Sequence, residues 1–215
     1  MKNWWEKLQG NEEVAYKEAY RRTGSYFGFF SVPEMEPAVK IAEMLKGKIT
    51  GNVLDIGCGV LPKPVYMFES PDVAWFGIDP FEGEHKREFE FKQATAEKIP
   101  YPDNMFDAVL FMSSLDHCQS PELALREAGR VLRLGGKLFV WEILYNDDSR
   151  YRQWEGSNEN WDGHHHWAFC DRTLTELLES SGVKLAHRFK VIHRYILRGN
   201  NKTYPDTWLY ESLLT

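Results

Sequence analysis

The sequence predicts an α/β fold with a doubly wound, mainly parallel sheet, and two observations support this. Apolar runs of strand length are typical of parallel strands buried on both faces, and they occupy residues 51–56, 72–78, 106–112 and 137–144. Helical patterns lie between or beside these runs, and the first run breaks into a glycine turn. Alternating strands and helices indicate helices on both faces of one sheet. At 215 residues the chain suits a single domain.

The first 46 residues are expected to form a helical extension of this domain. Residues 1–22 mix an apolar cluster with Lys and Glu, which is typical of an amphipathic helix. Residues 23–30 set glycines among aromatic residues, so the segment is either a hinged lid over a cleft or an apolar loop fixed against the core. Residues 37–46 predict a second helix that ends near Gly47.

Residues 53–59 (VLDIGCG) place an acid and two glycines at the end of the first predicted strand. Asp55 lies where open α/β sheets bind ligands, and glycines let a ligand approach the main chain. The segment resembles motif I of the class I S-adenosylmethionine-dependent methyltransferases. Within that family, it is most similar to the group called methyltransferase type 11. The resemblance implies that S-adenosylmethionine is bound by Asp55, Gly57, Cys58 and Gly59.

After Gly59 the sequence departs from that family's usual pattern, because Leu61 takes the place of a third glycine. Pro64 suits the first turn of a helix, where its missing N–H costs nothing, so we expect a helix to begin there. Pro62 occupies the position of the last glycine in the Gly-x-Gly-x-x-Gly fingerprint of dinucleotide-binding proteins. Binding of NAD is therefore not expected.

The second predicted strand ends at Asp79 and Pro80, about twenty residues beyond the glycine turn. An acid at this position can accept hydrogen bonds from both hydroxyls of a ribose, which indicates a ligand that contains a nucleoside. The alternative is that Asp79 only caps a turn. The family resemblance favours ribose binding by Asp79, with Pro80 beside it.

Residues 89–93 predict a third strand that leads into the segment 94–107. This segment resembles the part of the family that frames adenine and opens the fourth strand. The resemblance implies that Thr95 accepts a hydrogen bond from the adenine amino group, where the family often has Asp, and that the N–H of Ala96 contacts the ring.

The fourth predicted strand ends at Ser113, which the resemblance assigns to the cofactor site. His117 follows at the same sheet edge, beside the expected methyl position and next to Asp116. It is the first candidate for a base, although it could instead pack against the methionine end of the cofactor without transferring protons. A helix is predicted over residues 121–134, and Gly135 and Gly136 are interpreted as the turn that ends it.

Residues 145–169 have no regular pattern, and they contain three tryptophans and three consecutive histidines. Because this loop follows the fifth strand at the carboxyl edge, His164 or His166 could contact the substrate or act as a base. A metal site would need these histidines together with Asp147 or Asp148, and we expect none, since adjacent histidines more often form a polar loop. Together with residues 23–30, the loop is expected to roof the acceptor pocket.

The remaining sequence predicts a helix, two strands and a tail. The helix covers residues 171–181, with Asp171 as its N-cap. Residues 183–198 alternate like strand sequence and are interpreted as the last two strands. A short helix is expected after Pro205.

Composition excludes several other classes of protein. A net charge of -6 and a pI of about 5.7 argue against an extended nucleic-acid surface. No apolar run is long enough to span a membrane, and the N-terminus lacks the apolar core of a signal peptide. Three widely spaced cysteines favour reduced thiols and hence a cytoplasmic protein.

The resemblance covers residues 51–144 and implies a Rossmann-like sheet of seven strands with the last one antiparallel. It also implies S-adenosylmethionine as cofactor. We expect a methyltransferase that acts on a small molecule or a sugar, at oxygen. Two alternatives stay open: a non-catalytic regulatory module that binds S-adenosylmethionine, and a methyltransferase with a protein substrate. The sequence indicates neither the acceptor nor the oligomeric state.

Overall fold

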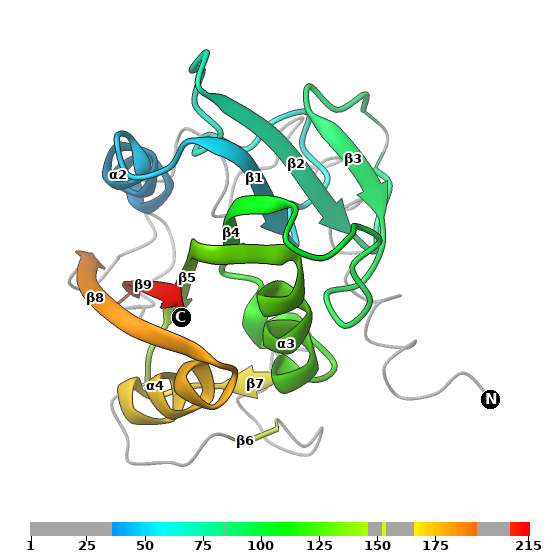
Figure 1. Ribbon diagram of the computed structural model, residues 1–215. Helices are drawn as coiled ribbons and strands as arrows, with labels where there is room; N and C mark the ends of the chain where they lie inside the picture. The colour runs from blue at the N-terminus through cyan, green and yellow to red at the C-terminus, as the bar shows by residue number, and fades with distance from the viewer. Residues whose placement is uncertain (1–35, 84, 146–151, 154–165, 193–206) are drawn as a thin grey trace, which may run out of the picture.

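A computed structural model describes residues 36–83, 85–145, 152–153, 166–192 and 207–215 (Figure 1). The predictions for residues 1–22, for residues 23–30 and for His164 fall outside this part of the chain. None of the described helices combines the length and the apolar character needed to cross a membrane.

The described residues form a main sheet, three α-helices and a short 3₁₀ turn. The strands of the main sheet are β1 (Gly51–Ile56), β2 (Val73–Asp79), β3 (Glu90–Gln93), β4 (Phe106–Met112), β5 (Leu132–Ile143), β8 (Val183–Ile192) and β9 (Thr207–Leu214). The helical elements are α2 (Glu36–Leu45), η1 (Leu115–His117), α3 (Pro121–Val131) and α4 (Asp171–Ser180). Two short strands, β6 (Arg152–Gln153) and β7 (Trp167–Ala168), pair separately.

The main sheet has the strand order β3-β2-β1-β4-β5-β9-β8. Strands β3, β2, β1, β4 and β5 pair in parallel, whereas β9 is antiparallel to both of its neighbours. The prediction of a doubly wound sheet of seven strands with an antiparallel last strand is confirmed. The order reverses between β1 and β4, and ligands of such sheets bind beyond the carboxyl ends of the strands at this point.

Apolar side chains fill both faces of the sheet, so its central strands are almost wholly buried. In β1, Leu54 and Ile56 pack on the face that carries α3 and α4, while Val53 packs on the opposite face with α2. Figure 1 accordingly draws α2 apart from α3 and α4. Each such side chain contributes about 1.5–3 kcal/mol by leaving water, and this burial holds the strand ends in fixed positions.

The helix predicted to begin at Pro64 is absent, since residues 57–72, all of them described, contain no helix. The Pro64 carbonyl accepts a hydrogen bond from the amide of Met67 at 3.0 Å, which closes one turn that does not continue. Tyr66 and Met67 instead lie buried in the core on the α2 face. Proline also disfavours helical angles in the residue before it, so Pro62 and Pro64 oppose a helix at Leu61 and Lys63.

The end of α3 also differs from its prediction. The helix stops at Val131, and Leu132 already has extended angles and pairs with Phe106 of β4. Gly135 and Gly136 therefore do not end a helix. They lie within β5, where the register shifts before Lys137 pairs with Ala108, and Gly135 supplies a φ of +75°.

The C-terminal predictions were wrong in two respects. Within residues 183–198 the structure describes one strand, β8, and the last strand is β9. The tail expected to form a helix is that strand, which pairs with β5 on one side and β8 on the other. Hydrogen bonds along both edges, together with buried Leu209 and Tyr210, outweigh the local preference of the tail.

The N-cap of α4 is Cys170, and Asp171 is the first residue of the helix. The amide of Cys170 donates to the hydroxyl of Thr173 at 3.0 Å. Asp171 instead accepts hydrogen bonds from Arg188 and Tyr210. Its carboxylate therefore ties the helix to β8 and β9.

Candidate functional site

A pocket opens at the carboxyl edge of the sheet, where the strand order reverses. Its walls come from the ends of β1, β2 and β4, from the segment after β3, and from η1. The lining residues are Ile56, Gly57, Asp79, Pro80, Phe81, Ala94, Thr95, Ala96, Glu97, Ser113, Ser114, His117 and Cys118. The fold thus brings together segments that are far apart in the sequence.

The glycine turn after β1 depends on close contact with the turn after β4. Gly57 has a φ of +75°, and a Cβ built on it would lie 2.5 Å from the Cβ of Ser114. The Ser114 hydroxyl in turn donates to the carbonyl of Ile56 at 2.6 Å. Gly59 also has a positive φ, of +71°, but a Cβ there would meet nothing within 4 Å. Gly57 is therefore required for packing and backbone angle, and Gly59 for the angle alone.

Asp79 fastens this turn to the end of β2. Its side chain is 5% exposed and lines the pocket. One carboxylate oxygen accepts the amide of Gly59 at 2.8 Å, and the other accepts the amide of Phe81 at 2.9 Å. Because each carboxylate oxygen can accept a second hydrogen bond, Asp79 can still bind two hydroxyls of a ligand.

Asp55 lies directly behind the turn and is fully buried. Its Oδ2 accepts a hydrogen bond from the hydroxyl of Tyr66 at 2.9 Å. Burial raises the pKa of Asp55 to about 7, the Tyr66 hydrogen bond opposes this rise, and the charge on Asp79 adds to it. This partner of Asp55 was not predicted, because the loop that carries Tyr66 was expected to be a helix.

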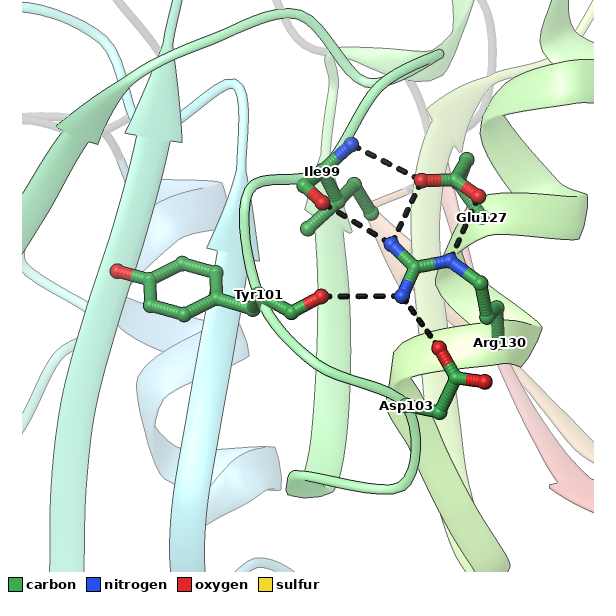
Figure 2. A network of polar contacts seen from close by, with 5 residues as sticks. All are labelled: Ile99, Tyr101, Asp103, Glu127 and Arg130. Carbon is green, nitrogen blue, oxygen red and sulfur yellow. Dashed lines mark hydrogen bonds and ion pairs between the residues drawn. The ribbon is translucent and has the colours of Figure 1, made fainter.

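The segment after β3 is held in place by Arg130 of α3 (Figure 2). The guanidinium donates to the carbonyls of Ile99 and Tyr101, each at 3.0 Å, and to the carboxylates of Asp103 and Glu127. Glu127 also accepts the amide of Ile99 at 3.0 Å. This network lies immediately after Thr95 and Ala96, so it fixes the wall of the pocket to the helix.

His117 reaches the pocket from η1, with 22% of its side chain exposed. Its Nε2 lies 3.6 Å from Oδ1 of Asp116. Behind them, the fully buried Glu142 of β5 accepts the amide of Leu115 at 2.9 Å. Glu142 was not among the predicted site residues. Its position inside the apolar run 138–144 was nevertheless a usable signal, because a buried carboxyl group is costly without a specific role.

The predicted site residues fall into three groups. Those that line the pocket are Gly57, Asp79, Pro80, Thr95, Ala96, Ser113 and His117. Asp55, Cys58 and Gly59 lie just behind it, in or below the glycine turn, and do not line it. His166 is buried, its amide donates to the Asp116 carbonyl at 2.9 Å, and it does not line the pocket.

Within the described residues, no group of three or more His, Cys, Asp or Glu side chains is arranged to hold a metal ion. His164, Asp147 and Asp148 lie outside these residues.

Residues 54–140 match a family model described as a methyltransferase domain. Phosphoethanolamine N-methyltransferase 3 of Arabidopsis thaliana is 34% identical over 123 residues, which cover 53% of this chain and 25% of that protein. The 27-O-demethylrifamycin SV methyltransferase of Amycolatopsis mediterranei is 33% identical over 117 residues, which cover 49% of this chain and 43% of that protein. The chain spans less than half the length of either relative.

A solved structure extends the likeness to nearly the whole chain. The 1,6-didemethyltoxoflavin-N1-methyltransferase of Burkholderia thailandensis superposes with a TM-score of 0.70 at 14% identity, over 99% of this chain and 91% of that one. At this identity the likeness concerns the fold. With the strand order, it gives this chain the fold of that methyltransferase, and residues 54–140 carry the match to the methyltransferase domain.

Proposed function

We propose that this chain transfers a methyl group from S-adenosylmethionine to an oxygen atom of a small molecule or sugar, with His117 as the base. The observation that carries the proposal is that His117 lines the same pocket as Asp79 and Thr95. A group that can accept a proton thus borders the pocket to which cofactor binding is assigned. The names of the two curated relatives, which refer to small molecules, support a small acceptor.

The residues of the pocket suit the cofactor. The carboxylate of Asp79 is preorganised by two backbone amides and can accept the ribose hydroxyls. Gly57 leaves the main chain of the turn uncovered. Asp55 is fully buried behind the turn and does not line the pocket, so it supports the turn through its hydrogen bond with Tyr66. Thr95 and Ala96 can bind adenine through a hydroxyl and an amide.

The bound cofactor supplies a methyl group made electrophilic by the sulfonium. The protein must then align the acceptor and remove its proton. Alignment can account for most of the acceleration, and rigid strand ends suit this task. His117 sits in a turn bonded to β5, so a neutral imidazole there can take the hydroxyl proton as the new carbon–oxygen bond forms.

A screen with labelled S-adenosylmethionine against metabolite pools, followed by His117→Ala, tests the proposal. Loss of a base should lower turnover by about 10²–10⁴-fold and leave the affinity for S-adenosylhomocysteine almost unchanged. If His117 only packs against the cofactor, His117→Ala should instead weaken cofactor binding and leave turnover at saturating cofactor almost unchanged. Label in protein rather than in metabolites would favour a protein substrate, and cofactor binding without any transfer would favour a regulatory module.

His166, the other described candidate for a base, is tested in the same assay as His117. The His166 side chain is 1% exposed, and its backbone bonds to Asp116, so we expect His166→Ala to act on the turn rather than on proton transfer. Roofing of the acceptor pocket by residues 23–30 and 145–169 remains a prediction. Limited proteolysis with and without cofactor addresses it, since equal cleavage in both states would count against a closing lid.

A further inference from the structure

Glu142 is a buried acid with no role in the function proposed above. It lies near the carboxyl end of β5, between Trp141 and Ile143, and its side chain is completely buried. Burying a carboxyl group among apolar residues costs several kcal/mol unless it is hydrogen-bonded or neutralised. The position therefore requires a physical explanation.

The carboxyl group of Glu142 lies beneath the 3₁₀ turn that carries His117. Its Oε1 accepts the amide of Leu115, the first residue of the turn, at 2.9 Å. Its Oε2 is buried and has no hydrogen-bond partner among the described residues. Glu142 therefore ties the turn to a different strand through one oxygen and keeps the other within the core.

Charged groups on this turn act on Glu142. Burial raises the pKa of Glu142 well above its usual range, and the neighbouring Asp116 carboxyl raises it further. The His117 imidazole and the backbone amides of Leu115 and Asp116 lower it. The influence between Glu142 and His117 must be mutual, because both effects reflect one electrostatic coupling.

His117 thus has acidic groups on two different elements. Asp116 lies on its own turn, with Oδ1 3.6 Å from Nε2 of His117, and Glu142 lies on β5. The other titratable groups around the turn and across the pocket are Cys118, His166, Glu97 and Asp79. Among all of these, Glu142 is the only one that holds the turn by accepting its first amide.

We infer that Glu142 is a positioning residue for His117, which anchors the turn through Oε1 and is electrostatically coupled to the imidazole that the turn carries. The inference deepens the proposed function, on which it rests. As the acceptor oxygen bonds to the methyl carbon, the carbon–sulfur bond breaks and its electron pair stays on sulfur. The hydroxyl proton moves to His117, and Asp116, whose Oδ1 lies 3.6 Å from Nε2, balances the new positive charge.

The test is an NMR titration of the His117 imidazole in the full chain with bound S-adenosylhomocysteine. The His117 resonance is identified by its absence in His117→Gln. Glu142→Gln keeps an oxygen for the Leu115 amide but removes the ionisable group. We expect the midpoint of the His117 titration to fall by roughly a few tenths of a pH unit, because Glu142 ionises only towards the upper end of that titration and then favours the protonated imidazole. The matched control Glu176→Gln, at an exposed position on α4, should leave it unchanged.

An unchanged His117 midpoint in a folded Glu142→Gln variant that still binds S-adenosylhomocysteine would overturn the inference. If Glu142→Gln does not fold, the coupling is measured from the other side, on the Glu142 carboxyl carbon in His117→Gln. That change should raise the pH at which Glu142 loses its proton, and no change would contradict the inference. Neither titration needs an acceptor. A failure of His117 as base therefore shows up in the methyl-transfer screen, separately from a failure of the coupling.

Discussion

At the scale of single residues, Gly57 and Gly59 have similar backbone angles but different surroundings. Both have positive φ values, of +75° and +71°. A side chain at Gly57 would collide with Ser114, whose hydroxyl holds the end of β1, whereas a side chain at Gly59 would enter open space. Substitutions at the two positions therefore distinguish the free-energy cost of a positive φ from the cost of a collision with Ser114.

We expect Gly59→Ala to lower the free energy of unfolding by about 1–2 kcal/mol, which is the cost of a left-handed angle for a residue with a Cβ. Gly57→Ala should cost a further 1–3 kcal/mol or so, because the Ser114 turn must move. Urea unfolding of both variants measures the difference. Equal destabilisation would mean that the Ser114 contact relaxes freely.

A second prediction at this scale concerns Asp55 and pH. Burial raises its pKa to about 7 in the folded chain, against about 3.9 when unfolded. For a raised carboxyl pKa, the stabilisation is complete below the unfolded value and is lost as the pH rises through the folded value. The window therefore runs from about pH 4 to pH 7, and the loss between pH 5 and pH 8 is about 2–3 kcal/mol.

Asp55→Asn removes this titration and keeps an oxygen for the Tyr66 hydroxyl. The free energy of unfolding of Asp55→Asn should therefore rise relative to wild type as the pH increases from 5 to 8. Urea unfolding of both proteins at several pH values measures this difference. The titration of other groups affects both proteins equally and therefore cancels. A constant difference between the two proteins would show that Asp55 ionises normally in the fold.

Some residues that line the pocket could be placed there from the sequence. Gly57 and Asp79 line it, and both could be predicted because a turn residue and an acid after a strand leave a short-range signal. Tyr66 and Glu142 could not be predicted, because their partners lie 11 and 27 residues away, at Asp55 and Leu115. Such pairs become visible only when the sheet brings the strand ends together.

At the scale of elements, the segment from Ile99 to Asp103 depends on α3 for its position. Arg130 satisfies two of its carbonyls, and Glu127 satisfies one of its amides (Figure 2). These bonds involve charged groups, which contribute more than neutral ones. The hydrogen bonds of Glu127 to Arg130 also lower the pKa of that carboxyl, against a smaller opposing effect of burial.

We expect Arg130→Ala to lower the free energy of unfolding by about 2–4 kcal/mol, because it leaves two carbonyls and Glu127 without their partner. Arg130→Ala should also weaken binding of S-adenosylhomocysteine, because the segment after β3, which lines the pocket at Thr95, is no longer held by α3. Arg126→Ala, at an exposed position on the same helix, is the control and should change neither quantity appreciably. Urea unfolding and calorimetry measure the two effects, and equal behaviour of the two variants would contradict the role of the network.

The elements that the sequence predicted well are those that local pattern determines. The bounds of β4 match the prediction because an apolar run stands between polar turns. The errors at Pro64, Gly135 and the C-terminal tail have one cause, which is that packing against the sheet outweighed local preference. Tyr66 is buried by the sheet, Leu132 pairs with Phe106, and β9 fills the space between β5 and β8.

At the scale of the whole molecule, alternating strands and helices were enough to predict the doubly wound sheet and the edge where the pocket lies. The position of Asp79 follows from this topology, because β2 pairs with β1 and ends beside the glycine turn. The acceptor could not be predicted in the same way. Acceptor recognition depends on loops, and residues 146–151 and 154–165 lie outside the described chain.

The last prediction links the pocket to the stability of the whole fold. A ligand that binds only the folded chain raises the free energy of unfolding by RT ln(1 + [L]/Kd), or about 2.7 kcal/mol at a hundredfold excess over Kd. S-adenosylhomocysteine should therefore raise the melting temperature, and NAD should not, because Pro62 interrupts the dinucleotide fingerprint.

Asp79→Ala should weaken binding of S-adenosylhomocysteine by about 1–3 kcal/mol, through lost hydrogen bonds to a charged group, and reduce the shift accordingly. Because this change also releases the amides of Gly59 and Phe81, the melting temperature without ligand should fall as well. Asp72→Ala, at an exposed position before β2, is the matched control and should keep the full shift. Stabilisation by NAD with none by S-adenosylhomocysteine would refute the assignment of the pocket, whereas equal shifts in both variants would refute only the role of Asp79.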